Sequence, residues 1–257
     1  MAKATLRIGY LYPKLMNLYG DRGNILALQA RAKWHGLETQ VRILNIGDTF
    51  TASDVDLLFV GGGQDREQRL IAQDMVGIKG EAIADAIRQD CAVLAICGGY
   101  QLLGRYYRIS ENDVLPGLGI FPVYTESGEQ RMISNTAIRT TFTGSEKPLV
   151  GFVNHGGQTY LDSDAMPLGT LIAGEGNHVG SADEGCIVHR AYGTYLHGAL
   201  LPKNPWFCDM LLQHAAEHAG IAWEPKALDD GIEDYAQKEA IGLAIRRSRA
   251  LTTSLKA

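Results

Sequence analysis

Short apolar runs alternate with stretches of helical periodicity through the first hundred residues. Runs of strand length occupy Leu6–Tyr12, Gln40–Ile46, Val55–Gly63 and Cys91–Ile96, and helical patterns occupy Arg22–His35 and about residues 64–89. Near-continuous apolar strands separated by helices are typical of a parallel sheet that is covered on both faces. We therefore expect an α/β fold with a doubly wound, mostly parallel sheet. Asp21 precedes the first helical stretch and is expected to cap it, and Gly36 is expected to end it.

The pattern changes after Gly104, where shorter apolar runs are separated by glycine and other turn residues. We expect these runs to extend the sheet and to add a partly antiparallel section. Two helical patterns then follow, at Phe207–His218 and Ile232–Arg249. Because no repeat, low-complexity tract or long linker interrupts the chain, residues 1–257 are expected to form a single domain.

Composition excludes several classes of protein. The formal net charge of −5 argues against a nucleic-acid-binding surface, which would require clustered Lys and Arg. No apolar stretch approaches the roughly 20 residues that span a bilayer, and the first residues lack the apolar core of a signal peptide. The four cysteines form no CxxC pair and no zinc-like cluster. We expect a cytoplasmic protein with reduced thiols, no transmembrane segment and no metal site.

The segment CAVLAICGGYQLLG places Cys97 between an apolar strand and two glycines that begin a helix. A residue at such a tight turn is exposed at the sheet edge, and nearby helix N–H groups favour its thiolate. Most free cysteines are buried core residues, but this context favours a nucleophile. The other three cysteines lack glycine neighbours at a strand end and are expected to be structural: Cys91, Cys186 and Cys208.

A thiolate that attacks a carbonyl carbon needs N–H donors for the developing oxyanion. The glycines of FVGGGQDRE follow a neighbouring strand, so we expect Gly62 or Gly63, together with Gly98, to supply these donors. The alternative is a phosphate-binding loop. However, GGGQDRE lacks the Lys-Ser/Thr of a P-loop, and GxGxxG is absent.

A cysteine nucleophile also needs a base that protonates the leaving group. Of the seven histidines, His155 in GFVNHGGQTY and His197 in AYGTYLHGALLP both lie at strand ends beside glycine. Residue pattern alone does not separate these two, and either one is compatible with a structural role.

Several of these segments together resemble the class I (Triad) glutamine amidotransferases of the cobyric-acid-synthase-like branch. They are NLYGDRGN, FVGGGQDREQ, CGGYQLLG, YTES, GFVNHGGQTY and GTYLHGALLPKNP. The resemblance covers nearly the whole chain and is closer still to the glutaminase subunits of lipid II isoglutaminyl synthases. It implies the flavodoxin-like sheet of that class.

The resemblance also implies the roles of individual residues. Cys97 of the CGGYQ motif matches the nucleophile, and His197 of the TYLHG motif matches the base. Arg131, shortly after YTES, matches the arginine that holds the substrate glutamine, and a guanidinium suits an α-carboxylate. Gln101, one turn after the cysteine, is expected to hydrogen-bond the substrate, although it also suits a structural position in the helix.

The chain departs from the class pattern at one position. Many class I enzymes carry a glutamate two residues after the histidine, where this chain has Ala199. Either another carboxylate of this chain orients His197 or a partner subunit supplies one. The resemblance favours the partner, and an unoriented imidazole would then make the isolated chain a weak glutaminase.

The implied function is glutamine hydrolysis that delivers ammonia to a Mur-ligase-like synthetase subunit. That partner would bind ATP and Mg, and would amidate the D-glutamate α-carboxyl of the lipid II stem peptide to D-isoglutamine. No cofactor is expected in this chain. The alternatives are a stand-alone cysteine γ-glutamyl hydrolase, a glutaminase that serves another acceptor such as a corrinoid carboxylate, and a non-catalytic scaffold.

Overall fold

A six-stranded sheet forms the centre of the computed structural model, which describes residues 5–254 and the side chains up to residue 248. Its strand order is β11-β12-β4-β3-β1-β2. The strands are β1 (Thr5–Leu11), β2 (Glu38–Leu44), β3 (Leu57–Val60), β4 (Ala92–Ile96), β11 (Cys186–Val188) and β12 (Ala191–Thr194). All neighbours pair in parallel except β11, which is antiparallel to β12. This arrangement confirms the predicted parallel sheet.

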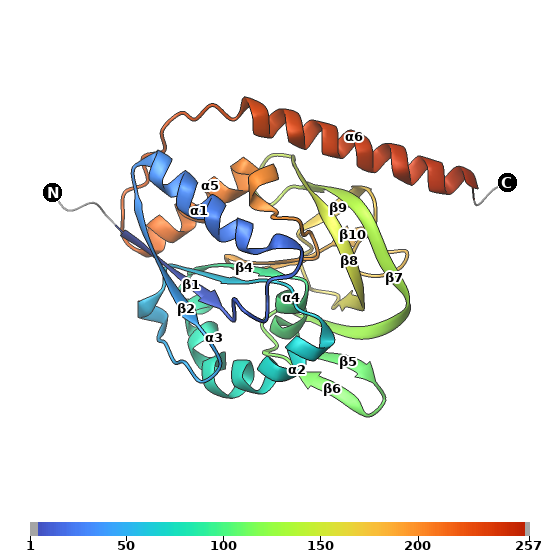
Figure 1. Cartoon of the computed structure of the whole chain (residues 1–257), viewed down its shortest axis with the longest axis horizontal. Helices are drawn as coiled ribbons and strands as arrows, with labels where there is room; N and C mark the ends of the chain where they lie inside the picture. The colour runs from blue at the N-terminus through green and yellow to red at the C-terminus, as the bar shows by residue number, and fades with distance from the viewer. Residues whose placement is uncertain (1–4, 255–257) are drawn as a thin grey trace.

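Helices cover both faces of this sheet, as the apolar strands require. Helices α1 (Arg22–His35) and α5 (Pro205–His218) lie over one face, and α2 (Asp65–Asp74) and α3 (Gly80–Arg88) lie over the other (Figure 1). Every residue of β3 and β4 is buried between these layers. The expected helical region at 64–89 is interrupted by a π-helical turn at Met75–Lys79, between α2 and α3.

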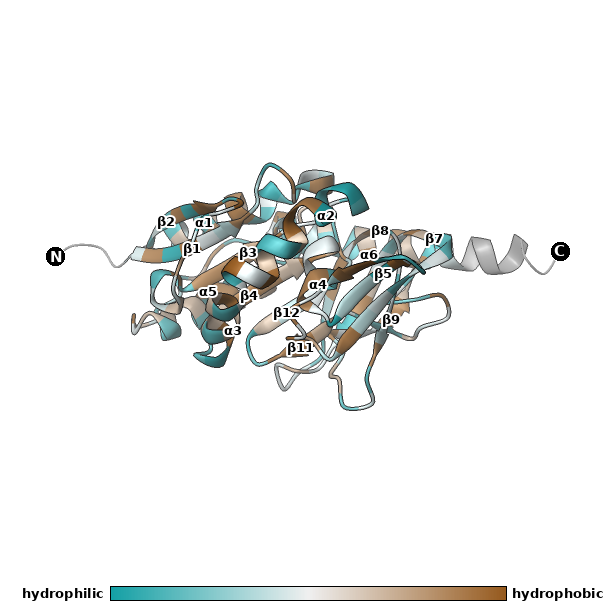
Figure 2. Cartoon of the chain, turned by 90° about the horizontal axis from the view of Figure 1, so that it is seen from below, coloured by the Kyte–Doolittle hydropathy of each residue, from teal (hydrophilic) through white to brown (hydrophobic). Residues whose placement is uncertain are grey.

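The shorter runs after Gly104 form a second, mostly antiparallel sheet. Its order is β10-β9-β7-β5-β6, with β8 paired to β7. The strands are β5 (Tyr106–Ser110), β6 (Asp113–Pro116), β7 (Val123–Thr140), β8 (Lys147–Leu161), β9 (Gly169–Ala173) and β10 (Asp183–Glu184). Buried and exposed residues alternate along much of β7 and β8, and hydrophobic and hydrophilic colours alternate along this sheet (Figure 2). Only β11 and β12 extend the first sheet, so most of the predicted extension is a separate sheet.

The chain ends on a long helix, α6 (Gly231–Ser254), which lies along the second sheet (Figure 1). Its Ala244 packs with Ala137 of β7 and Ala173 of β9. Short helical segments precede α1 and α5, at η1 (Leu18–Gly20) and η4 (Leu201–Lys203), and η2 (Ala52–Asp54) precedes β3. Among the described residues, no helix has the length and apolar character that crossing a membrane requires.

Candidate active site

Cys97 lies at a strained turn directly after β4. Its φ of +51° and ψ of −106° fall in a region that non-glycine residues rarely adopt, and α4 (Gly98–Leu103) begins at the next residue. A Cβ atom at Gly99 would lie 2.7 Å from the Val60 side chain and 2.9 Å from its carbonyl oxygen. Only glycine therefore lets α4 approach β3 so closely. The tight turn predicted at Cys97 is confirmed, but the predicted exposure is wrong, because the residue is only 6% exposed.

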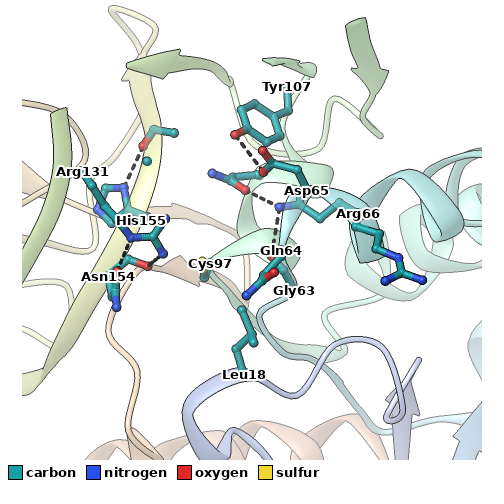
Figure 3. A pocket seen from close by; sticks show the side chains of 14 residues that line it. Leu18, Gly63, Gln64, Asp65, Arg66, Cys97, Tyr107, Arg131, Asn154 and His155 are labelled. Atoms are coloured by element: carbon teal, nitrogen blue, oxygen red, sulfur yellow. Dashed lines mark hydrogen bonds between the residues drawn. The ribbon is translucent and has the colours of Figure 1, made fainter. Parts of the chain in front are cut away.

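Cys97 opens into a cavity of about 380 Å³ at the carboxyl ends of β3 and β4 (Figure 3). The first sheet and its loops supply one wall, and β8 with the bulge of β7 supplies the opposite wall. The lining residues are Leu18, Gly63, Gln64, Asp65, Arg66, Gln68, Cys97, Gln101, Tyr107, Arg131, Asn154, His155, Gly156 and Gly157. The cavity is therefore formed jointly by the two sheets.

His197 follows β12, the strand that pairs with β4, and its side chain is fully buried. A Cβ atom at Gly62 would lie 2.5 Å from His197 Cε1 and 3.3 Å from Cys97 Cβ. His197 and Cys97 therefore both lie against Gly62. Burial alone lowers the pKa of His197. The negative charge of Cys97 and the hydrogen bond with Asp21 outweigh burial and raise the pKa to about 10. The structure thus brings together the cysteine and the histidine that the resemblance selected.

The carboxylate beside His197 belongs to this chain. Asp21 Oδ1 lies 3.1 Å from His197 Nδ1, and both side chains are fully buried. Asp21 occupies the N-cap position of α1 as predicted, but its side chain makes no capping hydrogen bond, because its two oxygens contact His197 and Gly62. Asn17 Oδ1 instead accepts from the N–H group of Arg22. Of the two alternatives for the orienting group, the structure shows a carboxylate of the same chain rather than one from a partner. The sequence separation of 176 residues hides this contact from any local pattern.

His155 also reaches the cavity, but its surroundings differ from those of His197. Its ring stacks on Tyr195 with the ring centroids 3.5 Å apart, and Nδ1 lies 2.7 Å from the carbonyl oxygen of Gly157. Burial lowers the pKa of His155 to about 4, so the ring is neutral near pH 7. The sequence pattern left both histidines as candidates for the base, but the structure distinguishes them. His155 packs against an aromatic ring and a carbonyl group, whereas His197 is paired with a carboxylate.

The three glycines predicted as oxyanion donors do not share one role. The N–H group of Gly62 donates to Asp21 Oδ2 at 2.7 Å, so the prediction of Gly62 as an oxyanion donor is wrong. The nitrogen of Gly63 lies 3.0 Å from the position of a Cβ atom at Gly98, so these two glycines are close together beside Cys97. Gly63 and Gly98 therefore stay as the predicted donors.

Arg131 lies in the bulge of β7 between Ser127 and Met132, which turns its side chain toward the cavity. Its Nε donates to Asn154 Oδ1 at 2.5 Å, and Asn154 precedes His155 on β8 (Figure 3). This guanidinium is thus held on the wall that faces Cys97. Its predicted role in holding glutamine stays a prediction.

Gln101 also lines the cavity, but its side chain is largely used within the protein. Its Oε1 accepts from Gln68 Nε2 at 2.9 Å, and its Nε2 donates to the hydroxyl of Tyr195 at 3.1 Å. Only one amide hydrogen remains for a ligand. The structural interpretation of Gln101 therefore accounts for most of its contacts, and its contact with substrate stays a prediction.

A second buried carboxylate, Glu184, supports the segment that leads to His197, and sequence reasoning missed it. It accepts from the Thr194 hydroxyl at 2.9 Å and from the Tyr195 N–H group at 2.6 Å. Burial raises the pKa of Glu184 to about 7. No periodicity or motif marks this residue, because it reaches β12 only in the folded chain.

The other three cysteines lie away from the cavity and are buried. Burial raises the pKa of the Cys91 and Cys186 thiols to about 12, and raises that of Cys208 further. Their thiols are therefore protonated and unreactive near pH 7, as expected for structural residues.

Comparison with known proteins gives three results. Residues 7–205 match the model of the CobB/CobQ-like glutamine amidotransferase domain. The chain is 39% identical over 245 residues to the GatD subunit of lipid II isoglutaminyl synthase (glutamine-hydrolyzing) of Staphylococcus aureus, with 95% of this chain and 98% of that protein covered. It is 31% identical over 194 residues to the cobyric acid synthase of Nocardia farcinica, with 71% of this chain but 36% of that protein covered.

Among solved structures, PurLQS of Thermotoga maritima matches with a TM-score of 0.58 and 12% identity, over 85% of this chain and 96% of that chain. At this identity the likeness shows the fold alone. It agrees with a mixed α/β architecture in which helices flank a parallel sheet.

Proposed function

The chain belongs to the CobB/CobQ-like glutamine amidotransferase family, and from this premise we propose that it is the glutaminase subunit of a lipid II isoglutaminyl synthase. The observation that carries the chemistry is the meeting of Cys97, at its strained turn, with His197 around Gly62. The observation that favours this acceptor is the match to the GatD subunit of Staphylococcus aureus over 98% of its length.

The reaction begins when the Cys97 thiolate attacks the side-chain amide carbon of glutamine. A bond forms between Sγ and that carbon, and the carbonyl oxygen takes up negative charge beside the N–H groups of Gly63 and Gly98. His197 gives its proton to the departing nitrogen, the carbon–nitrogen bond breaks, and ammonia leaves. Water, deprotonated by the neutral His197, then breaks the γ-glutamyl thioester and releases glutamate.

The cavity suits the charges of a free amino acid. Arg131 lies on one side of Cys97 and Asp65 on the other (Figure 3). A guanidinium binds an α-carboxylate, and a carboxylate binds an α-ammonium group. Asp65 already accepts from the hydroxyl of Tyr107 at 3.1 Å, which holds it at the cavity wall. We therefore assign α-carboxylate binding to Arg131 and α-ammonium binding to Asp65.

The proposed partner is a Mur-ligase-like synthetase subunit that binds ATP and Mg and receives the ammonia. It would activate the α-carboxyl of D-glutamate in the lipid II stem peptide and convert it to D-isoglutamine. Support comes from the Staphylococcus aureus relative, which is itself named a subunit. Because ATP is used on the cytoplasmic side, we place the complex there. Since both sheets line the cavity, we also propose that residues 1–257 act as one functional domain.

The decisive experiment measures ammonia release from glutamine by wild-type, Cys97→Ser and Cys91→Ser proteins, each alone and with the ligase subunit. Because Asp21 already orients His197, we expect the isolated wild-type chain to release ammonia, and the partner to increase the rate. Cys97→Ser should lose at least about 10³-fold in kcat, whereas the matched control Cys91→Ser should keep wild-type activity.

Each alternative function predicts a different result. Cys97-dependent release that does not respond to the partner would indicate a stand-alone γ-glutamyl hydrolase. Ammonia incorporation into a corrinoid carboxylate but not into lipid II would indicate another acceptor. Release that is unaffected by Cys97→Ser would contradict the nucleophile and favour the scaffold.

A further inference from the structure

The segment Asn17–Asp21 touches both halves of the site. The N–H group of Leu18 donates to the carbonyl oxygen of Gly62 at 3.1 Å, and the N–H group of Gly62 donates back to Asp21 Oδ2 at 2.7 Å. The ring of Tyr19, whose φ is +51°, packs edge-on against His197 with the centroids 5.0 Å apart. One short loop thus contacts the glycine loop and the histidine together.

We propose that Asp21 is a positioning residue that fixes the tautomer of His197 and, through Gly62, ties this histidine to the glycine loop. The inference rests on the proposed function, because it names the group that prepares the base of that reaction. Its two carboxylate oxygens have separate partners, since Oδ1 faces His197 Nδ1 and Oδ2 accepts from Gly62. Rotation of this buried carboxylate would break at least one of these bonds.

The tautomer follows from the acceptor. A carboxylate oxygen at 3.1 Å requires that the neutral imidazole carry its hydrogen on Nδ1. His197 Nε2 is then unprotonated and carries a lone pair. This buried atom has no hydrogen-bond partner among the described residues. This leaves Nε2 free to exchange a proton with Cys97 and with the departing nitrogen.

The contact with Gly62 has a second consequence. Asp21 accepts from the N–H group of Gly62, which fixes the peptide that links Gly61 to Gly62. The next peptide carries the N–H group of Gly63, and its carbonyl oxygen on Gly62 accepts from the Leu18 N–H group at 3.1 Å. A Cβ atom at Gly61 would lie 2.5 Å from the carbonyl oxygen of Met16, so the loop is also confined from the other side. Asp21 and Leu18 of one loop therefore hold the two successive peptides that precede the predicted oxyanion donor Gly63, and Asp21 also holds the base.

The charged groups around His197 determine its pKa. The charged groups that interact with it are Cys97, Asp21, Glu184 and His155. Tyr19 packs its ring against it, and Lys203 Nζ lies beside the neighbouring Gly198. Cys97 and Asp21 both raise the pKa of His197, and burial opposes them. In a Cys97→Ser background the thiolate is absent, so the remaining upward effect reports mainly on Asp21.

The chain offers a matched control in Asp56. This buried carboxylate also joins a backbone N–H group to a histidine: Oδ2 accepts from the Arg7 nitrogen at 2.8 Å, and Oδ1 lies 3.4 Å from His218 Nδ1. It does not line the cavity. Asp56→Asn therefore reproduces the structural cost of Asp21→Asn away from Cys97.

The test is NMR of ring-labelled histidine in the full chain, with His197→Asn used for assignment. In the Cys97→Ser background, Asp21→Asn should lower the titration midpoint of His197 by about one pH unit or more, roughly a 10-fold change in the ionisation constant, whereas Asp56→Asn should leave it unchanged. Nitrogen shifts of the His197 ring in the Cys97→Ser protein, recorded above its titration midpoint where the ring is neutral, should show the Nδ1–H tautomer. An Nε2–H tautomer or an unchanged midpoint would overturn the proposal.

A kinetic measurement with the ligase subunit present completes the test. Asp21→Asn should lower kcat for ammonia release by about 10²-fold or more with little change in KM, because Asp21 does not line the cavity. A higher KM with normal kcat would contradict a positioning role. If the wild-type complex releases no ammonia, the proposed function fails, while the tautomer and the midpoint still decide the role of Asp21.

Discussion

Strand β4 is flanked by a cysteine at each end, and each cysteine lies close to a buried aspartate that contacts a histidine. At the carboxyl edge, Cys97 meets His197, which is paired with Asp21. At the amino edge, Cys91 lies near Asp56, which contacts His218. The same residue types therefore occur at both edges of one sheet, but only one edge has the geometry of a catalytic site.

Three features separate the two edges. Cys97 has a strained backbone and opens to the cavity, whereas Cys91 is fully buried and burial raises its thiol pKa to about 12. Asp56 is ion-paired with Arg7, so its charge is already compensated. Asp21, in contrast, is paired with His197 and accepts from the Gly62 N–H group, and within the described part of the chain it has no ion pair with an arginine or a lysine. Residue identity alone therefore does not define a site; access, backbone strain and the group paired with the aspartate do.

The carboxyl edge has these features because of the parallel topology. Loops that leave the carboxyl ends of neighbouring parallel strands meet at one place, and helix N-termini point toward it. At the amino edge, β2 follows α1 and β4 follows α3, and Cys91 is buried there. The second sheet adds the remaining wall, since Arg131, Asn154 and His155 all come from β7 and β8.

The largest difference between the two edges is expected when His197 and His218 are each replaced by asparagine. His197→Asn should lower kcat for ammonia release by about 10²- to 10⁴-fold, because it removes the proton donor for the departing nitrogen. His218→Asn should stay within about 2-fold of wild type, since its contact with Asp56 lies at the other edge. Steady-state ammonia release checks both variants, and equal losses would contradict the assignment.

The two arginines provide the next test. Arg131→Met should raise KM for glutamine by about 10- to 100-fold, because a charged hydrogen-bond partner of the α-carboxylate is lost. Arg7→Met should leave KM unchanged and lower the thermal midpoint instead, since it removes the guanidinium partner of the buried Asp56. An unchanged KM in Arg131→Met would move carboxylate recognition to another group, such as Arg66.

The buried Glu184, near the carboxyl edge, predicts that the free energy of unfolding depends on pH. Burial raises its pKa to about 7, and none of the ion pairs found in the described part of the chain includes it, unlike Asp56. The stability that its protonated form contributes is present below the unfolded pKa of about 4.5 and is lost as pH rises through about 7. The unfolding free energy of wild type, relative to Glu184→Gln, should therefore fall by roughly 2–3 kcal/mol between pH 5 and pH 8.

Urea denaturation at pH 5 and pH 8 measures this difference. The exposed Glu239→Gln serves as a control and should show no such change. A difference that is constant with pH would mean that Glu184 titrates alike in the folded and unfolded states.

The smallest expected effect is that of Asp56→Asn. It should lower the free energy of unfolding by about 1–3 kcal/mol, because an uncharged amide cannot accept all the hydrogen bonds of Arg7. Its kcat and KM for glutamine should match those of wild type. Denaturation and ammonia release on the same preparation check both statements, and a reduced kcat would show that the amino edge influences the site.

Much of this architecture follows from local patterns in the sequence. Continuous apolar runs predict β1, β3 and β4, and helical periodicity predicts α1, α5 and α6. The CGG turn predicts the elbow at Cys97, because a short strand followed by glycines has few ways to enter a helix. His197 was separated from His155 only by the resemblance of its motif to a family.

The tertiary structure decided the rest. It directed the Asp21 side chain to His197 instead of a capping hydrogen bond, and it took the N–H group of Gly62 out of the oxyanion site. It also formed the expected antiparallel section as a separate sheet. Sequence periodicity reports which face of a local element is buried. It carries no information about which loop, 176 residues away, reaches a given side chain, because that depends on the order in which parallel strands pair.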